Sequence, residues 1–560
     1  MKKTILLLLV LTIFSCTKKN EISYKVSHAV NDSFPAVNIE MTFKANKSGE
    51  TILLISDDAW GEKNLYNTIS NLKSKQVTEI IKVKDSGWIV LKHKKSVTDI
   101  KLKYTLTQDF EGVLVSDKFY RPVIQESYFH ILSHSMFMIP KGYAIDSTSK
   151  FDVSIEWENY NKDFTIVNSF GSNIKQQEIK NTSKEVFESA IFTGGDYRVI
   201  EFDINSNKVV FSIRGEWETI TDSEIAGYIK KTIQIQRDFW DDHTQEYFSV
   251  IVTPTFLKEG SGLRGTSITN SFATGISNNK FLKTDELVKL FNHELMHNWI
   301  GGVIEYESGD QYWFSEGFTE YYSLKNIAKN KISGLDESYF IQQLNFNMKA
   351  LFVSSAKEVP NKEIINHYWD DYEYNRLPYR RGVIFAFYLD NKIQHDSHGE
   401  KSLDDLMIEF KEHAVNDNEK ITHKHFLKIA NKNLTEDLTP FFVKHIENGE
   451  FFDLQKIFKD FHYEFNPTGN VFDLGFTFVD DNEKNIRDIN INSNAYKAGL
   501  RKGDRIVGQS YNFGNPNYEA TFKVLKGSKK VSFKFFPSKI AQIPSLLDNL
   551  NNKKKISSLK

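Results

Sequence analysis

The chain has 560 residues, more than one hydrophobic core usually organises, so two to four domains are expected. Hydrophobic residues at 40% and charged residues at 26% are ordinary for soluble folded proteins and exclude global disorder. The 71 lysines and arginines nearly balance 73 aspartates and glutamates. The resulting formal net charge of -2 excludes nucleic acid as a main partner.

The N-terminus has the pattern of an export signal. Lys2 and Lys3 precede an apolar run over residues 5–14, which is too short to cross a bilayer comfortably. Residues 13–16 read Ile-Phe-Ser-Cys and resemble a bacterial lipobox, whose cysteine is lipidated. Because Cys16 is the only cysteine of the chain, an internal disulfide is excluded.

We therefore predict a lipoprotein signal peptide over residues 1–15, lipidation of Cys16 and a linker over residues 16–22. The mature chain would be an exported bacterial lipoprotein of the cell envelope, periplasmic or on the outer surface, held to the membrane by its N-terminal lipid. An ordinary cleaved signal peptide is the alternative interpretation of the same residues.

Residues 23–195 show period-two alternation of apolar and polar residues, as over residues 100–104, broken by Asn, Asp, Gly and Ser. This pattern predicts an N-terminal β-rich domain. After residue 195 helical patterns appear, first over residues 222–240 and later over 403–413 and 425–431, so a mixed α/β domain is expected over residues 196–465.

Short strand patterns return beyond residue 466, over residues 472–479, 504–509 and 531–535, separated by Gly and Asn turns. They predict a small β-rich module over residues 466–538. The remaining residues 539–560 carry Asn, Lys and Ser and are expected to fray from residue 545 onward. The predicted fold class is a multidomain α+β protein.

The motif with the clearest chemistry is His293-Glu294-Leu295-Met296-His297. Thr284 is expected to cap a helix that continues to Trp299, so that the two histidines lie one turn apart. Both imidazoles can then bind one zinc ion, and Glu294 leans toward the position of a bound water. Two helical histidines satisfied by carbonyl groups are the alternative, because a five-residue motif also occurs by chance.

A second segment, residues 313–322 (Trp-Phe-Ser-Glu-Gly-Phe-Thr-Glu-Tyr-Tyr), reduces the weight of that alternative. It begins a second helix, and an antiparallel return would bring Glu316 to the same metal as a third ligand. Three protein ligands leave the fourth position to water, as in catalytic zinc sites. Glu320, one turn later, either accepts a proton from His293 or His297 or is simply a solvated carboxylate.

These residues resemble the gluzincin metallopeptidases, in which a glutamate follows H-E-x-x-H after eighteen residues, and within them the glycyl aminopeptidase family. The resemblance implies one Zn²⁺ per chain, peptide or protein substrates, and a thermolysin-like catalytic domain between a β-rich domain and a PDZ domain. The segment 377–382 (Leu-Pro-Tyr-Arg-Arg-Gly) is similar to a family segment whose tyrosine stabilises an oxyanion, which assigns that role to Tyr379.

The C-terminal module is similar to a PDZ domain. Residues Leu474, Gly475 and Phe476 resemble its carboxylate-binding loop, and residues 493–506 resemble its core segment. PDZ domains bind the C-terminus of a peptide by strand addition. A module that only packs against the catalytic domain is the alternative.

One segment departs from the family. Relatives often carry a glycine-rich strand with a glutamate that binds the substrate amine, whereas this chain reads Gly262-Leu263-Arg264-Gly265. An arginine there would repel an ammonium group and favour a carboxylate or a carbonyl. Glu259 is the alternative amine-binding residue if the alignment shifts.

Three functions follow. The first is an aminopeptidase acting on small N-terminal residues such as Gly or Ala, with Glu294 as base and Tyr379 as oxyanion stabiliser. The second is an endopeptidase or a hydrolase of blocked peptides, which Arg264 favours. The third, from another class, is an inactive lipid-anchored PDZ binding protein.

Overall fold

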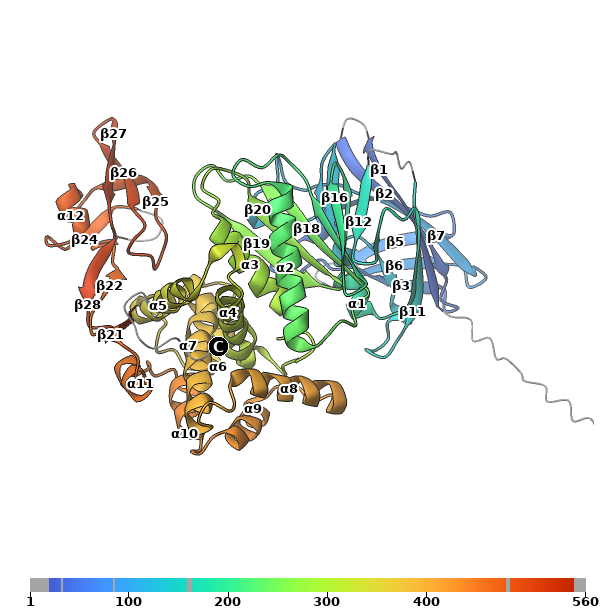
Figure 1. Cartoon of the computed structure of the whole chain (residues 1–560). Coiled ribbons are helices and arrows are strands. Elements are labelled where there is room, and N and C mark those ends of the chain that lie inside the picture. Colours follow the sequence, from blue (N-terminus) through green and yellow to red (C-terminus); the bar gives the residue numbers. More distant parts are fainter. Residues whose placement is uncertain (1–19, 32–33, 84–85, 159–163, 480–483, 548–560) are drawn as a thin grey trace, which may run out of the picture. The chain divides into compact units, whose positions relative to one another are not determined.

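The computed structural model describes residues 20–31, 34–83, 86–158, 164–479 and 484–547 (Figure 1). The predicted signal peptide, Cys16, residues 16–19 of the linker and residues 548–560 of the tail lie outside the described residues. Among the described residues, no helix is both long enough and apolar enough to cross a membrane. The described chain divides into two compact units, one up to residue 198 with residues 268–271, the other over residues 199–267 and from residue 272 onward.

The first unit consists mainly of three β-sheets, which confirms the predicted N-terminal β-rich domain. Alternation builds it: in β2 (Phe34–Lys44) Val37, Ile39, Met41 and Phe43 are buried while their neighbours face outward. The sheet orders are β14-β11-β1-β2-β7-β4, β10-β3-β6-β5 and β13-β12-β15-β9-β8.

The other elements of this unit are β1 (Glu21–Asn31), β3 (Glu50–Leu54), β4 (Ile69–Lys73), β5 (Val77–Val83), β6 (Trp88–His93), β7 (Asp99–Leu106), β8 (Val123–Ile124), β9 (Tyr128–Leu132), β10 (Ile139–Pro140), β11 (Phe151–Trp157), β12 (Thr165–Asn168), β13 (Gly171–Ser172), β14 (Gln176–Thr182), α1 (Lys184–Glu188) and β15 (Ile191–Gly195).

The second unit begins with a five-stranded sheet of order β16-β17-β18-β20-β19. Its strands are β16 (Arg198–Ile204), β17 (Asn207–Ile213), β18 (Tyr247–Thr255), β19 (Leu263–Ile268) and β20 (Ser271–Ser277). Strands β17 and β18 are parallel, and α2 (Asp222–Trp240) connects them. Thr221 and Glu224 form a capping box at the start of this helix, which has the bounds that the periodicity predicts. β19 stands at the end of the sheet order, so it is an edge strand.

Helices make up most of the remaining second unit, which confirms the expected helical region. They are α3 (Thr284–Met296), α4 (Tyr312–Lys329), α5 (Glu337–Val353), α6 (Asn361–His367), α7 (Tyr372–Asp396), α8 (Leu403–Asp417), α9 (His423–Ala430), α10 (Thr439–Phe442) and α11 (Leu454–Asp460).

The prediction for α3 was wrong at both ends. Lys283 occupies the N-cap position without a side-chain cap, and Thr284 is the first helical residue. The helix ends at Met296 rather than at Trp299, because the N–H groups of Asn298 and Trp299 donate to carbonyls three residues back and tighten the last turn.

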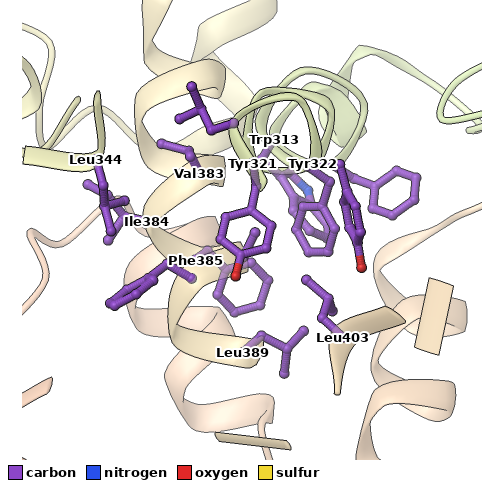
Figure 2. Close-up of a cluster of buried hydrophobic side chains, with 14 of the residues drawn as sticks. Trp313, Tyr321, Tyr322, Leu344, Val383, Ile384, Phe385, Leu389 and Leu403 are labelled. Carbon is purple, nitrogen blue, oxygen red and sulfur yellow. The ribbon is translucent and has the colours of Figure 1, made fainter. Parts of the chain in front are cut away.

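The closest helix contact in the second unit joins α4 to α7. A Cβ atom added to Gly382 would lie 2.1 Å from the carbonyl oxygen of Trp313, and one added to Gly317 would lie 2.3 Å from the Cα of Gly382. The two backbones therefore touch. Figure 2 shows the aromatic and aliphatic side chains that pack around this crossing, among them Trp313 and Tyr321 of α4 and Phe385 of α7.

A buried polar network supports the same helices. Lys325 of α4 lies 2.5 Å from Asp404 of α8 and 3.3 Å from Asp390 of α7, and its side chain is only 5% exposed. The hydroxyl of Tyr321 donates to Asp390 at 2.6 Å, and that of Tyr322 donates to Asp404 at 2.9 Å. These carboxylates satisfy the buried ammonium group from two different helices, which fixes α4 against α7 and α8.

The C-terminal residues form a small module whose core includes Ile486, Ala495, Leu500, Ile506 and Phe522. It contains a three-stranded sheet, β25-β26-β27, and the strand pairs β22-β28, β23-β24 and β21-β29. Its elements are β21 (Phe465–Asn466), β22 (Gly469–Phe472), β23 (Phe476–Phe478), β24 (Ile486–Ile489), α12 (Asn494–Ala498), β25 (Arg505–Ser510), β26 (Ala520–Lys526), β27 (Lys529–Phe535), β28 (Ser538–Ala541) and β29 (Ser545–Leu546).

The expectation that the tail frays from residue 545 was wrong for its first residues. β29 pairs with β21, and Ile543 and Leu546 are buried. Asn345 of α5 holds the backbone of Leu546 through hydrogen bonds in both directions, each 2.9 Å long. These two apolar side chains give the segment a core contact that its polar neighbours conceal in the sequence. The predicted domain limits stay predictions.

The close approach of α4 and α7 generates the first testable prediction. Gly382→Ala should lower the free energy of unfolding of the second unit by about 3 kcal/mol, because the added methyl group overlaps a backbone carbonyl that cannot rotate away. Urea denaturation midpoints measure the change. Gly227→Ala is the matched control, since this exposed glycine of α2 has nothing within 4 Å of an added Cβ, and the variant should gain about 0.5–1 kcal/mol. Equal stability of the two variants would contradict the close contact.

Candidate metal centre

Helix α3 places the first part of the site. His293 is the buried tenth residue of this helix, and His297 follows its last residue in a helical conformation, so both imidazoles project from one side. Their rings lie 4.9 Å apart between centroids and are nearly perpendicular, at 82°. The spacing of the motif therefore produces the local geometry that the sequence predicts.

Helix α4 completes the cluster with Glu316. Its Oε2 atom lies 3.4 Å from Nε2 of His293 and 3.5 Å from Nε2 of His297. This oxygen is buried and has no hydrogen-bond partner of acceptable geometry among the described residues. One donor atom from each of the three residues lies within 4.8 Å of the other two. Three potential ligands thus converge on a common point, and the Glu316 oxygen among them lacks a hydrogen bond of acceptable geometry.

The two histidines are held by different partners on their other nitrogen atoms. Nδ1 of His293 lies 3.4 Å from Oε2 of Glu320, which is 5% exposed and lies 2.6 Å from the ammonium group of Lys289. Nδ1 of His297 lies 2.9 Å from the carbonyl oxygen of Ile300. A proton on each Nδ1 leaves each Nε2 with a lone pair directed toward Glu316, which is the tautomer that binds a metal. Of the two partners that the sequence left open for Glu320, the structure places it beside His293.

The charges of the site favour a cation between these residues. Burial opposes the charged form of His293, but Glu316 and Glu320 outweigh it and raise the pKa of the imidazole to about 9. Burial likewise opposes ionisation of Glu316, yet the imidazole of His297 brings the pKa of that carboxyl far below its usual range. Without a metal, both imidazoles are therefore held in the protonated form beside Glu316, and a bound cation would take the place of those protons.

These residues fit a zinc ion. Two imidazole nitrogens and one carboxylate oxygen are among the ligands that zinc prefers, and a catalytic site has three protein ligands and one exchangeable position. The buried Oε2 atom of Glu316, which lacks a hydrogen bond, also indicates a metal ion. Burial of a carboxylate oxygen without a partner costs free energy, and a metal ion would offset this cost. His293, His297 and Glu316 would hold the ion.

Glu294 lies between the ligands and the edge strand β19. It is half-buried, and burial raises the pKa of its carboxyl above the ordinary value. A Cβ atom on Gly265 would lie 3.1 Å from Cγ of Glu294, and the hydroxyl of Ser267 donates to the backbone carbonyl of Glu294. The strand passes beside the carboxylate, and the absence of a side chain at Gly265 makes that approach sterically allowed.

Tyr379 of α7 faces the cluster from another side. Its ring stacks on that of His293, with centroids 5.7 Å apart and an angle of 20°. Burial raises the pKa of the phenol well above its ordinary value, so Tyr379 keeps its proton and can donate a hydrogen bond. The guanidinium of Arg376 lies 5.1 Å from the centre of the same ring, one helical turn earlier.

The structure places the remaining predicted residues as follows. Arg264 is exposed in β19, and side chains alternate along a strand, so it lies on the face opposite Gly265 and Glu294. Glu259 is exposed, with its carboxylate 3.8 Å from Lys523 of the C-terminal module. Leu263 is the first residue of the same edge strand, and Gly262 directly precedes it, where its backbone N–H donates to Ser277 Oγ at 2.8 Å.

The predicted peptide-binding loop of the C-terminal module turns at Gly475. This residue has φ of 77°, and its N–H donates to Asp473 at 2.7 Å. Leu474 and Phe476 pack against the core of the module. Among the described strands, β23 pairs with β24 alone, so its other edge carries no strand.

Comparisons with known proteins agree with this geometry. Residues 246–442 match the model of the Peptidase family M1 domain, a segment that contains the three proposed ligands, Glu294 and Tyr379. Leucine aminopeptidase 2-1 of Scheffersomyces stipitis is 25% identical over 193 residues, and Leucine aminopeptidase 2 of Candida albicans is 26% identical over 193 residues. In both cases the match covers 32% of this chain and 29% of the relative, so the chain matches less than a third of the length of these relatives.

A solved structure extends the similarity to nearly the whole chain. An aminopeptidase N family protein from Idiomarina loihiensis superposes with a TM-score of 0.70 and 13% sequence identity, covering 96% of this chain and 99% of that chain. At this identity the comparison shows a common fold. Residues 246–442 are thus similar to the M1 peptidase domain, and the chain shares the fold of the Idiomarina loihiensis protein.

Sequence reasoning missed two residues of the site. Lys289 lies one turn before His293 on α3, so the helical period was a signal for its contact with Glu320. Arg376 lies one turn before Tyr379, and the same period could have placed it beside the tyrosine ring. The contact of Gly265 with Glu294 had no local signal, because it joins a strand to a helix.

The asymmetry between the histidines generates a second prediction. Glu320→Gln should weaken zinc binding roughly 10- to 100-fold, because the amide orients His293 less strongly than a carboxylate, while Glu316→Ala should abolish zinc binding at this site. Zinc competition with a chromogenic chelator measures both effects. Glu337→Gln, at the partly buried start of α5, is the control and should bind zinc as the wild type does. Wild-type affinity in Glu320→Gln would show that this carboxylate does not orient the ligand.

Proposed function

We propose that this chain is a zinc-dependent aminopeptidase. The observation that carries the proposal is the convergence of Nε2 of His293, Nε2 of His297 and the unpaired Oε2 of Glu316 within a segment that matches the M1 peptidase domain. The two leucine aminopeptidases that match the same region support the aminopeptidase assignment over other peptidases.

In this function the three ligands hold one catalytic zinc ion. When bound, the zinc polarises the scissile carbonyl group and lowers the pKa of the attacking water. Glu320 and the carbonyl of Ile300 keep the two imidazoles in the orientation that binding needs. Lys289 neutralises Glu320 and prevents a second unpaired carboxylate beside the site.

Glu294 acts as the base. Its carboxyl is half-buried, and burial raises the pKa of this group, as suits a general base. The neighbouring imidazoles of His293 and His297 act in the opposite direction and limit the rise of this pKa. It takes a proton from the attacking water and returns it to the leaving amine. A side chain at position 265 would crowd Cγ of Glu294, so the glycine keeps the position of this carboxylate sterically allowed.

Tyr379 stabilises the oxyanion. A phenol that keeps its proton donates a hydrogen bond to negative charge that develops only in the transition state. Stacking on His293 fixes the ring, and the cation of Arg376 on its face makes the hydroxyl a stronger donor. The role assigned to this residue from the resemblance therefore has a physical basis in its surroundings.

The edge strand β19 is the proposed binding surface for the peptide backbone. An edge strand offers unpaired backbone groups to an extended peptide, and Gly265 lets that peptide approach Glu294. Because Arg264 lies on the opposite face of the strand, it does not oppose a free N-terminus at the base. The preference for N-terminal Gly or Ala follows from the resemblance to glycyl aminopeptidases, and hydrolysis of blocked peptides is the alternative specificity.

We also propose that the mature chain is an exported lipoprotein held to the membrane through Cys16, with the catalytic unit outside the cytoplasm. Its C-terminal module would act as a PDZ domain that captures the C-terminus of a peptide. The open edge of β23 supports this role, since strand addition needs an unpaired strand edge. An inactive binding protein is the competing function.

The third prediction tests the activity. Wild-type protein with zinc should hydrolyse Gly- and Ala-arylamides and leave N-acetylated peptides intact. Glu294→Gln should lose at least about 10²-fold in kcat and keep its zinc, because the base is removed while all ligands stay. Arylamide release and metal content of the same samples measure both quantities.

The other outcomes are equally informative. Cleavage of acetylated peptides would replace the aminopeptidase assignment by an endopeptidase one. An unaltered rate in Glu294→Gln would refute the mechanism, and zinc binding without any turnover in the wild type would favour the binding protein.

A fourth prediction concerns Tyr379. Tyr379→Phe should lower kcat about 10²- to 10³-fold with little change in KM, because the stacked ring remains while the donor to the transition state is lost. Steady-state kinetics on an Ala-arylamide measures the two constants. Tyr374→Phe, on the first turn of the same helix, is the control and should leave kcat within about twofold. A rise in KM at constant kcat would assign Tyr379 to substrate binding instead.

A further inference from the structure

A second group of histidines and carboxylates lies where α8 meets α9, far along the chain from the proposed catalytic residues. His413 belongs to the last turns of α8, Glu419 to the loop that follows, and His425 to the first turn of α9. One donor atom from each of these residues lies within 4.8 Å of the other two. Nδ1 of His413 lies 3.4 Å from Oε2 of Glu419, and Nε2 of His425 lies 2.9 Å from the same oxygen.

The local backbone brings these side chains together. Asn418 ends α8 with φ of 54°, in the left-handed region, and its N–H donates to the carbonyl of His413. The chain therefore reverses at once and returns Glu419 toward α8. Thr422 then caps α9 by accepting from the N–H of His425 at 3.0 Å, which points the first turn of that helix at the same place.

The orientation of His425 is the observation that indicates a positive charge between it and Glu419. Nδ1 lies 3.2 Å from the carbonyl oxygen of Lys420, so a proton on Nδ1 leaves a lone pair on Nε2. This side chain is only 10% exposed, and Nε2 is buried without a hydrogen-bond partner of acceptable geometry among the described residues. The lone pair faces a carboxylate oxygen 2.9 Å away, which is repulsive unless a positive charge lies between them.

The distances match those around a zinc ion. Bonds of about 2.0–2.1 Å in a tetrahedral arrangement separate neighbouring ligand atoms by roughly 3.3 Å. The two distances to Glu419, 3.4 and 2.9 Å, lie close to this value. The imidazole planes are nearly perpendicular, at 81°, with centroids 5.6 Å apart, so both rings can direct a nitrogen at one point. Nδ1 of His413 also forms a hydrogen bond with Oδ2 of Asp417 at 3.1 Å, which metal binding by this nitrogen would replace.

We propose that His413, Glu419 and His425 form a second metal site that binds Zn²⁺, with water in the fourth position. The ion would support the fold, because the loop that it closes is paired with the segment that links α3 to α4. The N–H of Ile421 donates to the carbonyl of Glu305 at 2.8 Å, and the N–H of Glu307 donates to the carbonyl of Ile421 at 3.1 Å. The bound ion thus stabilises the connection between the two helices that carry the catalytic ligands.

Zinc stoichiometry of the folded chain from residue 20 onward tests the proposal. After dialysis against buffer with trace zinc, the wild type should retain two zinc ions per chain by elemental analysis. His413→Gln and Glu419→Gln should each retain one zinc ion. Each substitution removes a direct ligand, so the zinc affinity of the second site should fall by more than the roughly 10- to 100-fold that follows the loss of a residue that only orients a ligand. Both variants should keep peptidase turnover per catalytic zinc, because neither residue belongs to the catalytic cluster.

Two comparisons separate this site from the catalytic one. The Glu316→Ala variant should retain the zinc ion of the second site, and added zinc should raise the melting temperature of this variant. The double variant Glu316→Ala/His413→Gln should retain no zinc, and added zinc should leave its melting temperature unchanged. His395→Gln is the matched control, since His395 also lies beside a carboxylate, 3.2 Å from Asp396, but without a second histidine, and it should keep both ions.

Equal zinc content and equal thermal shift in Glu316→Ala and its His413→Gln derivative would overturn the proposal. That result would mean that a second proton on His425, held as an ion pair with Glu419, supplies the positive charge. A wild type that binds a single zinc ion and loses it in His413→Gln would support this site. The same result would reject the proposed function, because the catalytic cluster would then hold no zinc.

Discussion

The contact between Gly317 and Gly382 is the constraint on which the proposed catalytic site depends. Each glycine lies within three residues of a functional side chain, Glu316 in α4 and Tyr379 in α7. Where the two backbones touch, Glu316 of one helix approaches Nε2 of His293 and Tyr379 of the other stacks on its ring. The packed aromatic side chains around the crossing, drawn in Figure 2, maintain a geometry that these two positions make sterically allowed.

The catalytic cluster is polarised by the unequal surroundings of its two histidines. One imidazole is supported by a carboxylate that a lysine neutralises, the other by a neutral backbone carbonyl. The stronger electrostatic partner makes His293 the more basic ligand, so the electron density donated to a bound ion differs between the two sides. The ring of Tyr379 stacks on this same imidazole. The two roles, ligand orientation and oxyanion stabilisation, are therefore connected through one side chain.

The sequence predicted the parts of the fold that local patterns determine. Period-two alternation indicated the β-rich first unit, and an apolar face with a 3.6-residue period gave the bounds of α2. The spacing of His293 and His297 determined their common direction because a helix fixes it locally. The contact between Gly317 of α4 and Gly382 of α7 joins positions 65 residues apart in the chain and has no local pattern. The same holds for Leu546, whose partner Asn345 lies on a helix 201 residues earlier. The assignments of Tyr379 and of the C-terminal module came from resemblance rather than from periodicity.

The buried network of Lys325 with Asp390 and Asp404 constrains how this protein can diverge. Removal of one charge leaves the others unpaired in the interior, which costs on the order of 3–5 kcal/mol, whereas replacement of the whole set by apolar side chains of similar volume is close to neutral. Single substitutions are consequently selected against, and the accessible evolutionary paths change these positions together. Related chains should therefore carry either the complete ionic set on α4, α7 and α8 or none of it, and the three positions should covary more strongly than the individual hydrophobic residues that surround them.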